Sequence, residues 1–229
     1  MKNIYIILPV MILLLSFSLI GQELVSFRVN EHYSVNALLD ERTGTPKQII
    51  GLRDHIRDYG YEKEEITENV IKEIGSKVID RYSDLLKIYP EDILIKNIDT
   101  DGEWWFVEYQ QVFEGILVEH SDVGFTINPD GYIVTLGGRI YPDIPPQPQS
   151  AILSDNALTI ASQRFDADTV EVRKGPQLVI LPVDVYGRLV YHLSYKIELF
   201  SLQPLKNYIY YINAVNGSVI KEYDNMIQS

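Results

Sequence analysis

The spacing of apolar residues predicts one long amphipathic helix in the first half of the chain. Between positions 62 and 88 an apolar side chain recurs every three or four residues, which places these side chains on one helical face. Gly75 interrupts this helix at a cost of about 1 kcal/mol relative to alanine. Pro90 ends it, because the residue before a proline avoids the helical conformation. The predicted apolar face consists of Ile66, Val70, Ile74, Val78, Tyr82 and Leu85.

Alternating and β-branched stretches predict antiparallel strands after this helix, whereas the residues before it are irregular and rich in turns. The tetrapeptide Asn128-Pro129-Asp130-Gly131 lies between two such stretches, and an Asp-Gly pair is typical of a hairpin turn. Gly131 supplies the positive φ that this turn requires. The predicted strands span residues 93–98, 104–112, 116–127 and 132–140.

The second half of the chain repeats the order of one helix followed by four strands. A proline-rich stretch, residues 141–150, cannot form a helix or a central strand, so we expect an extended linker there. Ser154 is the expected helix cap. The later strands are predicted at residues 178–183, 189–200, 208–214 and 219–223. The sequence therefore predicts an α+β fold with two tandem cystatin-like units, each a helix packed on a curled antiparallel β-sheet.

The first 21 residues have the pattern of an export signal. Lys2 precedes an apolar run that begins at Ile4, and Gly21 is a small residue at a plausible cleavage site. The run is also about long enough to be a membrane anchor, but Ser16 and Ser18 favour a cleaved signal. We thus predict a signal peptide at 1–21, a first domain at 22–140, a linker at 141–150 and a second domain at 151–229. The corresponding location is secreted, extracellular or periplasmic.

Charge and composition narrow the classes of partner. The formal net charge is -12, and Asp and Glu outnumber Lys and Arg by 32 to 20. Nucleic acids and anionic membrane surfaces are therefore disfavoured, because binding them needs clustered positive charge. We expect no nucleic acid partner and no stable membrane association after signal cleavage. The chain has no cysteine, which excludes disulfides, thiolate metal sites and a cysteine nucleophile.

No arrangement of residues typical of catalysis occurs in the sequence. The zinc motif H-E-x-x-H and the serine-hydrolase motif G-x-S-x-G are both absent, and we expect no cofactor. His120 follows Glu119 on a predicted strand, where neighbouring side chains point to opposite faces and cannot share a metal. We interpret all four histidines as structural or surface residues: His32, His55, His120 and His192. The sequence predicts a protein that is not an enzyme, and a catalytic role stays the least favoured reading.

Two adjacent tryptophans offer a possible contact surface. Trp104 and Trp105 lie at the start of a predicted strand, so one is expected in the core and the other exposed. An exposed tryptophan is a candidate for a partner contact, although a cross-strand packing role is the simpler interpretation.

Several segments, taken in order, resemble the pro-region of thermolysin-family metallopeptidases. Residues 43–51 (TGTPKQIIG), 105–118 (WFVEYQQVFEGILV) and 128–133 (NPDGYI) are similar to the fungalysin/thermolysin propeptide domain. Residues 154–161 (SDNALTIA), 189–193 (LVYHL) and 210–220 (YYINAVNGSVI) are similar to the PepSY domain. Two positions depart from the pattern, because Asn213 replaces an acidic residue and Leu117 replaces a proline. The family's zinc peptidase domain is not among these 229 residues, so no catalytic residue is carried over.

The resemblance implies a propeptide-like protein that binds, inhibits or assists the folding of a thermolysin-like zinc metallopeptidase, in trans or as the front part of a zymogen. The alternative is a secreted binding or structural module that kept the fold and lost this role. Under the first hypothesis we expect the strand 104–112, the hairpin at Asp130 and the C-terminal tail to contact the partner. The candidate contact residues are Trp104, Trp105, Gln111, Asp130, Asn213 and Tyr223.

Overall fold

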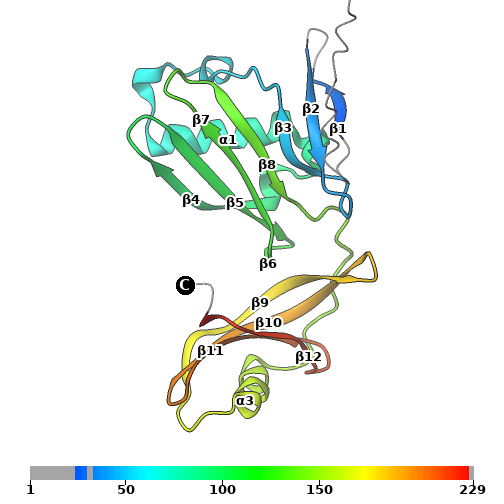
Figure 1. Ribbon diagram of the computed structural model, residues 1–229. Helices are drawn as coiled ribbons and strands as arrows, with labels where there is room; N and C mark the ends of the chain where they lie inside the picture. Colours follow the sequence, from blue (N-terminus) through cyan, green and yellow to red (C-terminus); the bar gives the residue numbers. More distant parts are fainter. Residues whose placement is uncertain (1–23, 30–32, 227–229) are drawn as a thin grey trace, which may run out of the picture.

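The computed structural model describes residues 24–29 and 33–226. The predicted signal peptide and His32 lie outside these residues. The described chain begins with a three-stranded antiparallel sheet in the order β1-β2-β3, formed by β1 (Leu24–Arg28), β2 (Ser34–Leu39) and β3 (Pro46–Ile50) (Figure 1). Among the helices described, none has the length and apolar character that crossing a bilayer requires.

The predicted long helix is shorter than expected and is broken into pieces. Two 3-10 turns, η1 (Ile56–Tyr59) and η2 (Lys63–Glu65), precede α1 (Glu68–Arg81), which is followed by α2 (Ser83–Leu86) and the 3-10 turn η3 (Pro90–Asp92). The hydroxyl of Thr67 accepts a hydrogen bond from the Val70 amide at 3.3 Å, so α1 begins at Glu68 instead of at residue 62 as predicted. The helix buries Ile74 and Val78 as predicted, together with Ile71 and Ile79.

A nine-stranded sheet forms most of the molecule. Its path runs β12-β11-β10-β9-β6-β5-β7-β8, and β4 pairs with β5 beside this path. The pair β6–β9 is parallel, with Leu117 opposite Val179, and the other pairs in the sheet are antiparallel. The strands are β4 (Ile93–Thr100), β5 (Trp105–Phe113), β6 (Ile116–Val118), β7 (Asp122–Ile127), β8 (Ile133–Arg139), β9 (Glu171–Val185), β10 (Arg188–Leu202), β11 (Leu205–Asn213) and β12 (Val219–Asp224).

This topology shows that the predicted fold class was wrong. The described chain is mostly β, and it holds one mixed sheet plus a three-stranded sheet in place of two separate cystatin-like α+β units. The predicted strand 116–127 is in fact two strands, because a turn at Glu119 and His120 separates β6 from β7. The short strand that this turn creates is the one that pairs with β9. A contact between positions 117 and 179 leaves no local pattern in the sequence. The local patterns therefore favoured two separate tandem units, and this prediction was wrong.

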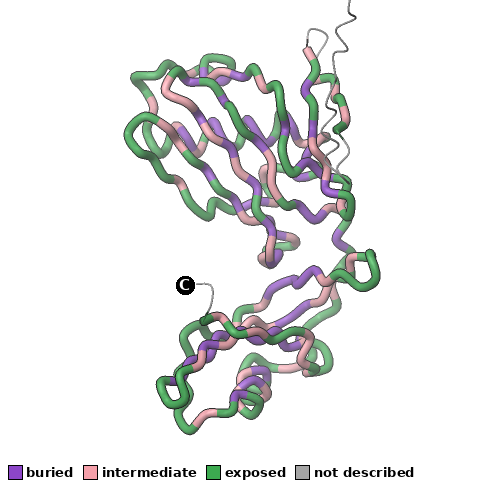
Figure 2. Tube along the Cα trace, in the orientation of Figure 1, coloured by how far each residue is buried: buried purple, intermediate pink, exposed green. Residues whose placement is uncertain are grey.

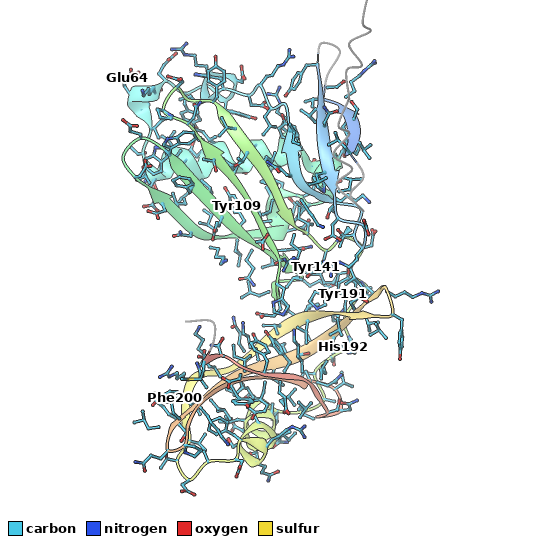
Figure 3. All side chains as sticks on the ribbon, in the orientation of Figure 1. Glu64, Tyr109, Tyr141, Tyr191, His192 and Phe200 are labelled. Carbon is cyan, nitrogen blue, oxygen red and sulfur yellow. The ribbon has the colours of Figure 1, made fainter. Side chains whose placement is uncertain are left out.

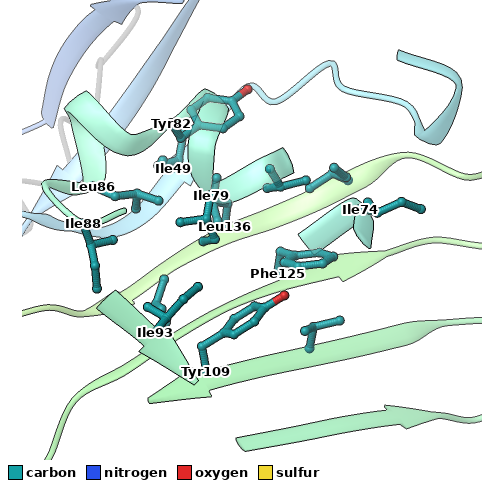
Figure 4. Close-up of a cluster of buried hydrophobic side chains, with 14 of the residues drawn as sticks. Ile49, Ile74, Ile79, Tyr82, Leu86, Ile88, Ile93, Tyr109, Phe125 and Leu136 are labelled. Carbon is teal, nitrogen blue, oxygen red and sulfur yellow. The ribbon is translucent and has the colours of Figure 1, made fainter. Parts of the chain in front are cut away.

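The core of the first half lies between α1 and strands β5, β7 and β8 (Figure 4). Ile74 and Val78 from the helix pack in one cluster with Tyr109 and Phe125 from the sheet. Gly75 lies where the helix meets Tyr109, and a β-carbon at this position would overlap the Tyr109 hydroxyl. The glycine that looked like a weak point of the helix is therefore required by the close approach of helix and sheet.

A buried carboxylate ties the first three strands to α1. Asp54 is 1% exposed and accepts hydrogen bonds from the hydroxyls of Tyr33 and Tyr59, each at 3.1 Å. The Tyr82 hydroxyl also donates to it, and Arg81 Nε lies 3.0 Å from its Oδ1. Because these partners come from before β2, from η1 and from the end of α1, one carboxylate fixes three segments.

The core of the second half lies between α3 (Ser154–Arg164) and one face of strands β10 and β11. Ala157 and Ala161 are fully buried against this face, where Ile197 and Tyr210 lie. The helix begins at Ser154, but its N-cap is Leu153 and carries no side-chain hydrogen bond. The predicted capping role of Ser154 is therefore wrong.

The proline-rich linker contains neither helix nor strand, and it is anchored at its start. Tyr141 and Ile144 are buried in a cluster with Val118 and Ile180, beside the β6–β9 pair. The exposed stretch from Pro145 onwards leads to α3 (Figure 2). The domain boundary assigned to residues 141–150 remains a prediction.

We predict that Asp54→Ala lowers the free energy of unfolding by about 3–5 kcal/mol, because it leaves a partly buried guanidinium and three hydroxyls without their acceptor. Urea denaturation followed by circular dichroism measures this change. Asp168→Ala, at an exposed loop position, is the matched control and should shift stability by less than about 0.5 kcal/mol. Equal effects of the two substitutions would show that Asp54 does not have this role.

We also predict that Gly75→Ala destabilises the protein by about 1–3 kcal/mol, although alanine is the better helix former. The Tyr109 hydroxyl that would clash is buried and has no hydrogen-bond partner among the described residues. Tyr109→Phe should therefore be neutral or stabilising, and it should remove most of the cost of Gly75→Ala in the double variant. Thermal unfolding of the three variants tests the contact, and a more stable Gly75→Ala protein would contradict it.

Candidate binding surface

Among the described residues, no helix packs on one of the two faces of the nine-stranded sheet. On β5, Val107 and Tyr109 point into the α1 core, so the alternate side chains from Phe106 to Val112 point to the other face. Val112 pairs with Leu117 of β6, which pairs in turn with Val179 of β9. Paired residues share a face, so this helix-free face continues from the first half of the sheet into the second.

The same face continues across the C-terminal strands. Val179 and Leu181 of β9 cluster with Ile209 and Tyr211 of β11, whereas the residues that contact α3 lie on the opposite face. Helices α1 and α3 and the start of the linker therefore all cover one side of the sheet (Figure 1). These described segments leave the other side of the sheet uncovered.

A buried ion pair lies where the two halves of the sheet meet on this face. We call this junction, formed by Glu119, Lys196 and Tyr211, the seam. Glu119, which follows β6, is 5% exposed and receives hydrogen bonds from Lys196 Nζ at 2.8 Å and from the Tyr211 hydroxyl at 2.7 Å. Its amide donates to the Ile180 carbonyl at 2.8 Å and extends the β6–β9 pairing by one residue. Burial and the adjacent carboxylate both raise the pKa of the Tyr211 hydroxyl, so it stays a donor at neutral pH.

His120 sits beside this pair in a strained turn. Its φ is 60°, and its ring lies 6.2 Å from the Tyr211 ring, so Glu119 and His120 both reach the same tyrosine. The expectation that these neighbours point to opposite faces was wrong, because the strand ends at Val118 and strand alternation does not apply beyond it. The His120 Nε2 atom is buried and has no hydrogen-bond partner among the described residues.

Tyr223 extends the seam along the edge of the sheet. Its ring stacks on Tyr211 with centroids 6.4 Å apart, and Lys221 Nζ lies 5.4 Å from the Tyr223 ring centroid. Of the six predicted contact residues, Tyr223 is thus the one that packs directly against Tyr211 of the seam. Glu119, Lys196 and Tyr211 were not predicted. A glutamate and a lysine inside apolar strand segments were the available signal, because charges buried there need partners.

Gln111 and Asn213 have structural roles. Gln111 is buried, and its side chain exchanges two hydrogen bonds with the backbone of Tyr141, at 2.8 Å and 3.0 Å. Asn213 Oδ1 accepts from the amides of Val215 at 2.8 Å and Asn216 at 3.1 Å, which closes the β11–β12 turn. An aspartate could accept the same two bonds, so Asn213 leaves the turn of the PepSY-like pattern intact.

Three of the predicted contact residues lie away from the seam, at the opposite end of β5 from β6: Trp104, Trp105 and Asp130. Both tryptophans are half-buried, so the expected division into one buried and one exposed residue is wrong; Trp104 precedes β5 and is part of a turn. Trp105 and Pro129 line a shared shallow pocket, which brings the tryptophan and the hairpin together. Asp130 is exposed, and its carbonyl accepts from His55 Nε2 at 2.8 Å. Gly131 has a φ of 87°, which confirms its turn role.

The open part of the helix-free face lies over β5, β7 and β8. Phe106 is 42% exposed there and stands opposite Asp99 on one side and Thr126 on the other. The Thr126 hydroxyl accepts a hydrogen bond from the Thr135 hydroxyl at 2.8 Å. An apolar centre surrounded by polar side chains is the usual composition of a protein interface. We call this patch the open face; it comprises Phe106, Glu108, Gln110, Thr126 and Thr135.

Metal binding finds no support in the described residues. Within residues 24–29 and 33–226, no three His, Asp or Glu side chains come together as metal ligands. His192 is half-buried on β10, on the helix-free side, and burial lowers its pKa (Figure 3). At the seam, Glu119 bonds to Lys196 and to the Tyr211 hydroxyl, so its carboxylate is held in structural contacts.

We predict that stability falls as the pH drops through the titration of His120. Burial first, and then repulsion from Lys221, Lys196 and Arg139, lower the pKa of this ring, against the attraction of Glu119. Because the folded pKa lies below the unfolded value of about 6.5, the unfolded chain takes up a proton that the folded chain refuses. The free energy of unfolding should therefore decrease below about pH 6.5 and level off once folded His120 is also protonated.

Urea denaturation at several pH values measures this loss. His120→Asn keeps a residue that tolerates a positive φ and removes the titration, so part of the loss should disappear. His192→Asn is the matched control, since burial lowers the pKa of that ring without the nearby cations; its effect should be smaller. A His120→Asn protein with the same pH dependence as the unmodified chain would contradict the assignment.

Comparison with known proteins leaves the family open. No family model matches the chain, and no curated protein matches it. Among solved structures, the chain is similar to the Bacillus megaterium YpeB C-terminal domain, with 14% sequence identity and a TM-score of 0.38 over 89% of each chain. A likeness this loose carries no argument about fold or partner. The resemblance to the thermolysin propeptide and PepSY domains is therefore a prediction from the sequence motifs.

Proposed function

We propose that this chain is a non-catalytic protein that binds a partner protein through the open face of its sheet, and that the partner is a thermolysin-like zinc metallopeptidase. Binding would inhibit the peptidase or assist its folding. The observation that supports a binding role is the one-sided sheet, whose helices and linker cover one face and leave Phe106 exposed at the centre of the other.

The physical basis for binding is an exposed aromatic side chain on a rigid platform. Phe106 projects from β5, which is held by β4 on one side and β7 on the other. Little conformational entropy is lost when a partner covers a side chain of this kind, so the ordering cost that offsets the buried apolar area is small. Aromatic residues at the centre of an interface are also its usual energetic anchors.

The choice of a metallopeptidase as partner rests on the motif resemblance. The segment 105–118, one of those similar to the propeptide pattern, forms β5 and β6 and so supplies Phe106 and the strand that pairs with β9. The segment 210–220 forms the end of β11 and the turn that Asn213 closes. The proposed secreted or periplasmic location follows from the predicted signal peptide and would place the chain with exported peptidases.

A tight-binding titration tests this function. The mature chain, residues 22–229, is added in increasing amounts to the neutral metallopeptidase activity in the culture fluid of the source organism. We expect a stoichiometric loss of activity. A protein that is folded by circular dichroism but neither binds nor slows the peptidase would reject the proposed partner and favour the alternative of a binding module without a peptidase role.

Phe106→Ala should weaken the inhibition at least about tenfold, which corresponds to about 1.4 kcal/mol of binding free energy. Leu153→Ala is the matched control, because Leu153 is an apolar residue that is 72% exposed next to α3, on the covered side of the sheet. Its inhibition constant should be unchanged. If both variants inhibit equally well, the open face is not the contact surface.

A further inference from the structure

The outer edge of β4 is an open strand edge that the rest of the described chain leaves unpaired. β4 hydrogen-bonds to β5 alone, whereas β8 at one end of the sheet has β3 packed against it, with Gly137 close to the Lys47 carbonyl. A free edge presents a row of amide and carbonyl groups to which another extended chain can pair.

Near the start of β4, this edge has one exposed apolar side chain on each face of the sheet. Leu94 pairs with Gln110 and lies on the helix-free face, where it is 55% exposed; Ile95 pairs with Tyr109 on the opposite face and is 43% exposed. An added strand would therefore find an apolar neighbour for its side chains above and below the sheet.

Lysine on an edge strand usually protects it from pairing, and Lys96 occupies a β-bulge in the middle of β4. Here its Nζ lies 3.5 Å from the Glu108 carboxylate on β5, so the side chain leans inward over the sheet. The charge is compensated, and the residues on both sides of the bulge remain available for pairing.

Acidic side chains stand at both ends of this edge. Glu91 and Asp92 precede β4, and Asp101 and Glu103 follow it in the exposed β4–β5 turn. A second copy of β4 in antiparallel pairing would bring the acidic start of one strand against the acidic end of the other, which disfavours self-association. A basic segment would be attracted at both ends.

We propose that the outer edge of β4 binds an extended, basic segment of a partner protein, which adds a strand to the sheet beside Leu94 and Ile95. This contact is distinct from the open face centred on Phe106, and it does not require that the partner be a peptidase. It gives a role to the acidic residues around β4.

The probe for this edge is a fluorescent peptide of alternating lysine and valine, added to the mature chain, with a glutamate–valine peptide of the same length as its control. We expect the basic peptide to bind, with an affinity that falls as salt is added, and the acidic peptide not to bind. Hydrogen exchange in the unmodified protein should slow at least about tenfold for those amides of residues 93–100 that point away from β5, with β5 amides unchanged. No binding, or binding without this protection, overturns the proposal.

Leu94→Lys should weaken peptide binding at least about tenfold by removing an apolar contact and adding repulsion. Leu205→Lys is the matched control, since Leu205 is 57% exposed on β11 and should leave binding unchanged. Equal weakening by both variants would show that only net charge matters and would overturn the proposal. Concentration-dependent self-association that Leu94→Lys abolishes would identify a second copy as the occupant and would likewise contradict it.

Discussion

The parallel pairing of β6 with β9 is the constraint on which the arrangement of the two halves depends. β6 is only three residues long, yet it is antiparallel to β5 on one side and parallel to β9 on the other. The turn that leads into it, Glu114-Gly115, has positive φ at both residues, as a tight two-residue hairpin requires. Glu119 then extends the pairing and places its carboxylate against Lys196 and Tyr211. A short ladder alone would hold the halves weakly, and the buried ion pair and the apolar cluster around Tyr141 strengthen it.

The one-sided covering of the sheet follows from this connection. Because β6 keeps the strand alternation of β5 and passes it to β9, the faces covered by α1 and α3 coincide. The linker also runs along the covered side, where Gln111 holds its first residue. The functional proposals both arise from what remains uncovered: the open face around Phe106 and the outer edge of β4. Rigid strands position both surfaces, so a partner would meet them already formed.

Local patterns predicted the local structure well and the long-range structure poorly. The hairpin at Asn128–Gly131, the apolar face of α1 and most strands were readable because turn chemistry and periodicity act over a few residues. The break at Glu119 was missed, although four consecutive polar residues, 119–122 (EHSD), interrupt the apolar pattern there. The partners that fix the turn, such as Lys196, are distant in the sequence and leave no local pattern. Gly75 was misjudged for the same reason, since helix propensity carries no information about Tyr109. Of the predicted contact residues, Gln111 and Asn213 are explained by backbone hydrogen bonds. The exposed Phe106, which directly follows the two tryptophans, was not among the predicted contact residues.

The measurement that tests the account most directly is whether the two halves unfold together. Both tryptophans lie in the first half, at the start of β5, so their fluorescence reports on that half alone, whereas far-ultraviolet circular dichroism reports on all strands. A single sheet joined through β6 and β9 predicts coincident urea transitions by the two signals. Two separate transitions, with the tryptophan signal changing independently of the remaining strands, would show that the halves are autonomous and that the seam does not join them.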